Sequence, residues 1–127
     1  MPVYNAAVIP KSVAPGDVET VWNAETPAPG NGGASASAQV ALVQAGGSSS
    51  CHFDGKFSGA PGAFEVDCQG ADVDADGNYQ TFSGLNITSV DSVNNTFHAE
   101  VITDVRFVRM LMRSRTNAVS ITATIGR

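Results

Sequence analysis

Charged side chains are scarce in this sequence of 127 residues, and basic ones are the scarcer kind. They make up 15% of the chain, against about 25% in typical soluble proteins, while hydrophobic residues make up 43%. A chain of this composition is expected to fold, and its length fits one domain. Seven basic against twelve acidic residues give a formal charge of -5, the wrong sign for neutralising phosphates. We therefore expect no nucleic-acid partner.

Long apolar runs are also missing. No stretch approaches the roughly 20 apolar residues that a membrane span needs. The first residues, MPVYN, have neither the basic segment nor the long apolar segment of a secretion signal. The sequence thus predicts a soluble protein made in the cytoplasm, with no membrane partner.

Residues that favour helices are few. Leucine occurs 3 times and glutamate 4 times, against 15 valines and 9 threonines, which favour extended backbone. The 13 glycines and 12 serines add the residues of tight turns. This composition predicts an all-β fold of short strands, and no segment reads as a helix.

Proline is nearly absent after residue 29, and five of the six prolines precede that point. Each removes a backbone donor and favours extended conformations before it. We expect residues 1–37 to form an extended arm and linker with one short strand near 18–22, and residues 38–127 to form the body. Tyr4 and Trp22 would be exposed to water in a free arm, so we expect the arm to pack either on another chain or along the edge of the body, with these two as candidate interface residues.

Alternation of apolar and polar residues predicts a hairpin from residues 51–57 and 64–68. Two registers keep the apolar faces together. One sets Cys51 opposite Cys68 across a four-residue loop, and the other pairs Cys68 with Phe53 across a six-residue loop. Short loops favour the first. Whether the two cysteines form a disulfide stays open, although thiols are kept reduced in the cytoplasm.

A second hairpin is expected from residues 107–113 and 119–125, with Met112 opposite Val119 and Met110 opposite Ile121. Its apolar face belongs to the core. Weaker strands are expected near residues 79–82, 85–90 and 96–102. Seven or eight short strands predict an antiparallel two-layer β-sandwich of jelly-roll or immunoglobulin-like type, with the extended N-terminal arm.

The other face of this second hairpin carries apolar groups interleaved with arginines, and exposed apolar patches of this kind are rare on monomers. We expect a protein-protein interface there, with cover by the N-terminal arm of the same chain as the alternative. Residues 64–100 carry seven acids and no lysine or arginine, whereas 101–127 carry five arginines and one aspartate. Such asymmetry is satisfied by cross-strand pairs or by contact between copies. The predicted interface residues are Phe107, Arg109, Leu111 and Arg113.

Three aspartates, Asp72, Asp74 and Asp76, alternate before a glycine, as at the start of a calcium loop. Ser83 stands where an EF-hand has its bidentate glutamate, so an EF-hand is excluded. The carboxylates form either a weak calcium site or, more simply, an acidic surface turn, and no metal requirement is expected. His52 and His98 each precede an acid by two residues, but no nucleophile motif accompanies them. We expect no enzyme activity and no cofactor.

Three segments carry a resemblance. They are FSGAPGAFEVDCQGADVDADGNY from Phe57 to Tyr79, RFVRML from Arg106 to Leu111, and NAVSITATI from Asn117 to Ile125. Together they resemble small β-sandwich structural proteins of tailed bacteriophage virions, over roughly residues 50–127. The resemblance implies a non-enzymatic virion component present in many copies.

The leading functional expectation is a capsid decoration (cement) protein. It would bind the major capsid protein at the outer surface of the shell, as a homo-oligomer. A tail, neck or fibre-associated subunit is the alternative within the same class. A sugar-binding module is the alternative from another class, because sandwiches serve that function widely.

Overall fold

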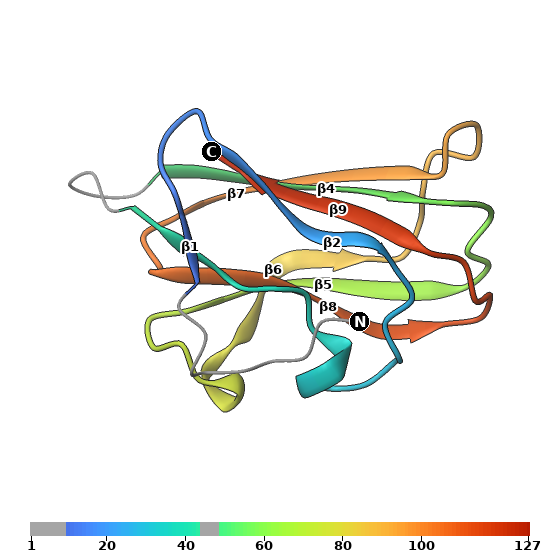
Figure 1. Cartoon of the computed structure of the whole chain (residues 1–127), viewed down its shortest axis with the longest axis horizontal. Coiled ribbons are helices and arrows are strands. Elements are labelled where there is room, and N and C mark those ends of the chain that lie inside the picture. Colours follow the sequence, from blue (N-terminus) through green and yellow to red (C-terminus); the bar gives the residue numbers. More distant parts are fainter. Residues whose placement is uncertain (1–9, 44–48) are drawn as a thin grey trace.

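The computed structural model describes residues 10–43 and 49–127, which fold into two facing β-sheets (Figure 1). Within this part of the chain the helical elements are two short 3-10 turns, η1 and η2, and no helix there could span a membrane. The all-β prediction is confirmed. The elements are β1 (Lys11–Val13), β2 (Val18–Glu25), η1 (Gly33–Ser35), β3 (Val40–Leu42), β4 (Ser49–Phe57), β5 (Phe64–Ala71), η2 (Asp76–Asn78), β6 (Gln80–Ile87), β7 (Thr96–Thr103), β8 (Phe107–Arg115) and β9 (Ile121–Gly126).

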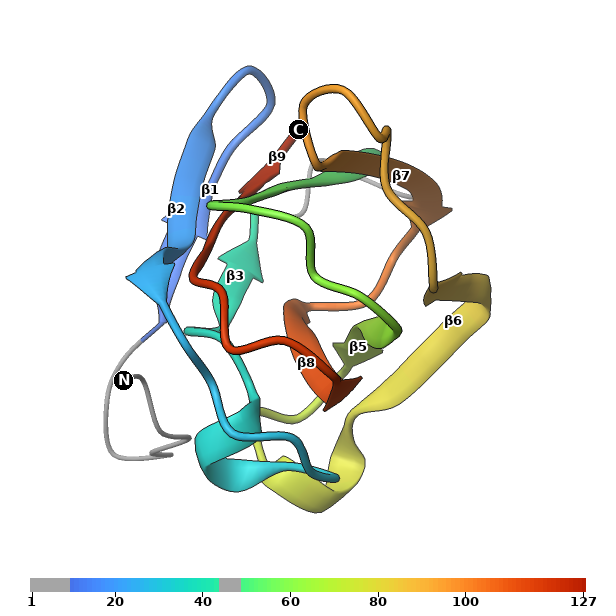
Figure 2. The same ribbon diagram turned by 90° about the vertical axis from the view of Figure 1, so that its right-hand side faces the viewer.

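The first sheet, sheet A, has the strand order β1-β3-β8-β5-β6, and the second, sheet B, has the order β2-β9-β4-β7. Strand pairs are antiparallel except β1 with β3, which are parallel. Figure 2 shows β6 and β7 at one side of the sandwich and β1 and β2 at the other. Of the consecutive strands described, only β5 and β6 are neighbours in one sheet, so the chain otherwise crosses between sheets at each connection.

The two predicted hairpins are therefore wrong. β4 lies in sheet B and β5 in sheet A, and likewise β8 lies in sheet A and β9 in sheet B. Cys51 pairs with Val101 rather than with Cys68, and Met110 pairs with Cys68 rather than with Ile121. The physical reason is that alternation fixes only which side chains point inward. An arch that carries the chain from one sheet to the facing one brings the same apolar faces together as a hairpin does.

The inward side chains themselves are those expected from the alternation. Sheet B contributes Phe53, Phe57, Phe97 and Ile121, and sheet A contributes a second set that is equally buried, namely Val66, Cys68, Val108, Met110 and Met112. Gly55 also points inward, beneath the ring of Phe97, where a Cβ atom would lie 2.3 Å from two ring carbons. The aromatic ring therefore fills the space that glycine leaves in the sheet.

Residues 10–25 line the edges of the sandwich. β1 pairs with β3 at the edge of sheet A, and β2 pairs with β9 at the edge of sheet B. The prediction that Trp22 contacts another protein is wrong, because its side chain is completely buried in the core. The described part of the predicted arm, residues 10–37, is extended as its prolines indicate, but it is built into both sheets. Tyr4 lies outside the described residues.

Both cysteines are free thiols within the core. Burial raises the pKa of Cys51 to about 12, against a partial opposing effect of Arg127. Burial also raises the pKa of Cys68, with smaller contributions from Cys51 and Asp67. Each thiol is therefore protonated at neutral pH and shielded from reagents.

This environment predicts unreactive cysteines in the native protein. At pH 8 a maleimide should label neither Cys51 nor Cys68 within the time that labels a small thiol completely, because the thiolate is the nucleophile. In guanidinium chloride both should react. Mass spectrometry counts the labels, and fewer than two labels in the denatured, unreduced protein would contradict the free thiols.

Candidate functional site

The predicted interface on β8 is covered by the chain itself. Residues 27–37, which we call the cover segment, run beside β8 on the side where β3 pairs with it, and at Gly32 and Gly33 they lie against Asp76 on the outer face of sheet A. Ala36 forms a bridge with Leu111, and the backbone N–H of Ser37 donates to the carbonyl of Met110 at 2.8 Å. Figure 2 shows the cover segment beside the η2 turn, on the side of β8 away from β9. Leu111 is completely buried, so the alternative of intramolecular cover is the one observed.

The composition of the cover segment, which lacks large side chains, predicts a flexible linker or an exposed loop. Its small residues are what allow the backbone to approach the sheet, and Ser35, Ala36 and Ser37 are all buried. At Gly32 a Cβ atom would lie 2.8 Å from both carboxylate oxygens of Asp76. The segment thus binds through backbone hydrogen bonds and close contact rather than through apolar side chains.

Arg109 lies beneath this cover, and its side chain is only 1% exposed. Its Nε donates to Oε1 of Gln69 at 2.9 Å and its Nη1 donates to Oδ1 of Asp76 at 2.6 Å. The guanidinium also lies 4.2 Å from the ring centre of Tyr79, within cation-π range. Asp76 in turn accepts the backbone N–H of Gly33 from the cover segment. Arg109, which was predicted to contact another protein, therefore connects β5, the η2 turn and the cover segment within its own chain. We call this arrangement the internal clamp.

Arg113, which was also predicted to lie in an interface, makes a second internal ion pair. Its Nε and Nη2 each lie 2.6 Å from Oδ2 of Asp67, whose side chain is only 4% exposed. Asp67 also accepts hydrogen bonds from Thr81 and Asn86 of β6. Two arginines of the basic C-terminal segment are thus paired internally with acids of the acidic middle segment. Phe107, the fourth predicted residue, is half-buried on β8.

The three aspartates of the calcium-like pattern do not converge. Asp76 faces Arg109, whereas Asp74 accepts a hydrogen bond from the hydroxyl of Tyr79 at 2.8 Å. Asp72 is exposed. In residues 10–43 and 49–127 no group of three or more His, Cys, Asp or Glu side chains is placed to hold a metal ion. The pattern serves a turn whose carboxylates accept hydrogen bonds from the protein.

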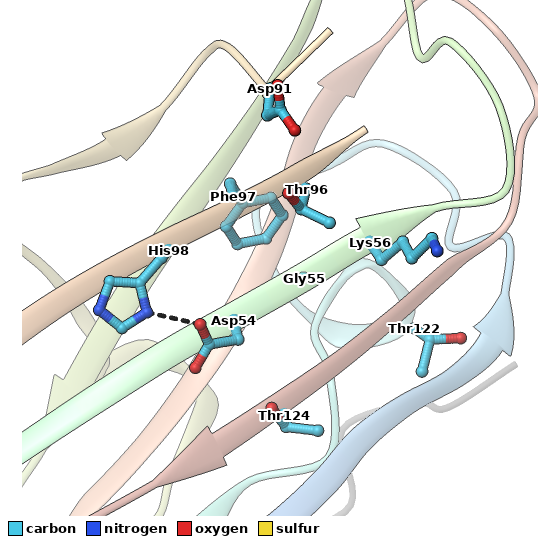
Figure 3. Close-up of a pocket in the computed structure, with 9 residues that line it drawn as sticks. All are labelled: Asp54, Gly55, Lys56, Asp91, Thr96, Phe97, His98, Thr122 and Thr124. Atoms are coloured by element: carbon cyan, nitrogen blue, oxygen red, sulfur yellow. Dashed lines mark hydrogen bonds and ion pairs between the residues drawn. The ribbon is translucent and has the colours of Figure 1, made fainter. Parts of the chain in front are cut away.

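The main open hollow of the described structure lies elsewhere, on the outer face of sheet B (Figure 3). It has a volume of about 530 Å³. Strands β4, β7 and β9 supply its polar side chains, and Asp91 comes from the turn before β7. The lining residues are Asp54, Gly55, Lys56, Asp91, Thr96, Phe97, His98, Thr122 and Thr124.

His98 is the most strongly held polar group of this hollow. Its Nδ1 lies 2.5 Å from Oδ1 of Asp54, and its Nε2 lies 3.1 Å from Oε1 of Glu100. His52 lies on the other side of Asp54, with its Nδ1 3.8 Å from Oδ2 of that carboxylate. The hydrogen bonds with Asp54 and then Glu100 raise the pKa of His98 above its ordinary value. Both ring nitrogens of His98 therefore face carboxylates of its own chain.

Alternation along residues 51–57 and 96–102 predicts outward directions for His52, Asp54, Lys56 and His98, but it does not bring the four together. The signal for their outward direction was present in the alternation of β4 and β7. Their proximity depends on which strands are neighbours, and the hairpin interpretation assigned β4 the wrong neighbour.

Comparison with known proteins adds no information on the fold or the site. No protein-family model matches the chain, and neither a curated protein nor a solved structure matches it.

Replacing Arg109 tests the internal clamp. Arg109→Met should lower the free energy of unfolding by about 3 kcal/mol, because it leaves Gln69 and Asp76 without their shared partner. Arg109→Lys should not rescue the loss, since one ammonium group cannot bond Gln69 and Asp76 in the same fork geometry. Urea unfolding followed by tryptophan fluorescence measures the change. The matched control is Arg106→Met at an exposed arginine of the same segment, and equal effects at both positions would contradict the clamp.

Titration of His98 tests the polar cluster. Its raised folded-state pKa means that the Asp54 interaction stabilises the protein fully below the unfolded pKa of about 6.5, and that this stabilisation is lost as the pH rises through the folded pKa. Histidine NMR signals should show a midpoint above 6.5 for His98, and Asp54→Asn should lower that midpoint. An unchanged midpoint in Asp54→Asn would rule out this cause.

Proposed function

We propose that this chain is a non-enzymatic structural protein of a tailed phage particle, and specifically a capsid decoration protein that binds the outer surface of the shell. The strand order carries the proposal. β2 pairs with β9, β3 with β8, β4 with β7 and β5 with β6. The chain from β2 to β9 is therefore one long hairpin that has been rolled into two facing sheets.

This order supports a jelly roll, which is the finer fold that we propose for the sandwich. Jelly rolls are recurrent in viral capsid domains, as well as in lectins and cupins. The segments that resemble phage virion proteins coincide with central strands, because they include β5 and most of β9 together with the first half of β8. Fold and resemblance thus support the same class of protein by separate routes.

The polar groups support a binding rather than a catalytic role. Arg109 and Arg113 are engaged with acidic partners inside the molecule. At the open hollow, His98 is held between two carboxylates, and neither of its ring nitrogens is directed at a hydroxyl nucleophile. A small module with internally fixed charges suits repeated attachment to a lattice of identical subunits.

The partners under this proposal are the major capsid protein or other virion subunits, together with further copies of this chain. The protein would be located in the virion, after assembly in the host cytoplasm. A tail, neck or fibre subunit with the same fold is the alternative site of attachment.

A sugar-binding module is supported by the hollow on sheet B, whose threonines and carboxylates offer hydrogen bonds to hydroxyl groups. Such modules typically stack sugar rings on exposed aromatic side chains, for which the sequence offers Tyr4, Trp22 and Tyr79. Trp22 and Tyr79 are both buried, and Tyr4 lies outside the described residues. The virion proposal is therefore the better supported.

Immunogold labelling of purified virions tests the location. Antibodies raised against the purified chain should decorate the capsid shell of the phage whose genome encodes it, in many copies per particle. Gold confined to the tail or neck would instead favour the alternative subunit. Purified virions that carry no label would overturn both, and specific retention on a glycan array would then favour the sugar-binding module.

A further inference from the structure

The outer edge of β7 is the longest regular sheet edge of the described structure. β7 pairs with β4 through eight consecutive residue pairs without a register shift. The other edges are interrupted or short: β2 has two register shifts against β9, β6 has one against β5, and β1 has three residues. Proteins protect open edges by bulges, prolines, lysines or short strands. β7 contains no proline and no lysine, and it exposes Ile102.

The direction of the backbone groups follows from two hydrogen bonds at the start of β7. The carbonyl of Asn95 accepts from the N–H of Phe57, on the β4 side, and the carbonyl of Thr96 accepts from the N–H of Asp91, on the opposite side. Because these directions alternate along a strand, His98, Glu100 and Ile102 point their N–H and C=O groups away from β4. Within residues 10–43 and 49–127, β7 is the last strand of its sheet.

We propose that this edge is a self-association surface, where β7 of one copy pairs antiparallel with β7 of a second copy about a twofold axis at Ala99. This register sets His98 opposite Glu100 of the partner subunit, twice, and the side chains of that pair lie on the same face of the sheet. Opposite charges placed directly across two strands stabilise their pairing.

Neighbouring registers are less complementary. An axis at Glu100 would oppose two identical carboxylates, and an axis at His98 would oppose two imidazoles. An axis at Val101 would place Glu100 against the apolar side chain of Ile102. The register at Ala99 also puts the smallest side chain of the strand centre on the axis, where two identical residues meet.

Pairing at this edge would join the two copies of sheet B into one continuous sheet and bring the two His98–Asp54 clusters side by side. The inference rests on the part of the proposed function that names further copies of this chain as partners, and it holds whether the particle bound is a shell or a tail. Closed twofold dimers are the commonest symmetric assemblies.

Cysteine cross-linking tests the register in the full chain. At the proposed axis, Ala99 and its mate form a non-hydrogen-bonded pair, in which Cα atoms lie about 4.5 Å apart. Ala99→Cys should therefore form an interchain disulfide rapidly on treatment with diamide. Val101→Cys is the matched control, since it is half-buried on the same face, and both variants are made with Cys51→Ala because Cys51 is the cross-strand neighbour of Val101 in β4. Its mate would lie about 13 Å away along the strands, beyond the roughly 7 Å that a disulfide tolerates.

Sedimentation velocity over a range of concentrations tests association itself. The parent chain should dimerise, and Glu100→Pro should weaken dimerisation at least about tenfold, because proline removes an outward N–H without touching the β4 side. Circular dichroism checks that this variant folds, and the cysteine variants decide the question if it does not. A parent chain that stays monomeric, a preference for cross-linking at Val101, or an unweakened Glu100→Pro dimer would each overturn the proposal. Virion labelling by a monomeric chain would overturn it while leaving the proposed function intact.

Discussion

The buried guanidinium of Arg109 connects three parts of the molecule, namely strand β5, the η2 turn and the cover segment. A cation removed from water is costly unless it is paired and hydrogen bonded. Here Gln69 of the neighbouring strand and Asp76 of the η2 turn accept hydrogen bonds from the guanidinium, and the ring of Tyr79 lies against it. Asp76 also accepts the backbone N–H of Gly33, which links Arg109 to the cover segment. The outer face of sheet A becomes an interior, which is why strand β5 is buried along nearly its whole length.

The direction of side chains could be predicted from the sequence, whereas the neighbours of the strands could not. Alternation correctly placed Phe53, Met110 and Ile121 inward and His98 outward. It could not distinguish a hairpin from an arch, because both bring two apolar faces into contact. The roles of Arg109 and Leu111 could not be predicted from the sequence for a related reason. An apolar and arginine-rich face needs cover, but only the path of the chain shows that residues 27–37 supply it.

The two outer faces of the sandwich differ in how their charges are used. On sheet A, Arg109 is paired with Asp76 and fully buried, and Arg113 is paired with the buried carboxylate of Asp67. On sheet B the cluster around His98 stays at the surface, next to a regular strand edge. Glycine at position 55 contributes indirectly, because it lets Phe97 lie flat on the inner side and keeps β4 and β7 in register. The covered outer face of sheet A and the exposed outer face of sheet B thus lie on opposite sides of one small core.

The pairing of β2 with β9 has a kinetic consequence. It joins Val18 to Gly126, and the adjacent carbonyl of Arg127 accepts the N–H of Gly16, so closing this part of the sandwich requires contact between segments more than 100 residues apart. Loops of that size form late, and proteins dominated by such contacts fold in milliseconds to seconds. We expect the β5–β6 hairpin to form early and the β2 edge to dock last. Until it docks, Trp22 remains in water and β9 remains open to other chains, so folding competes with aggregation at high concentration.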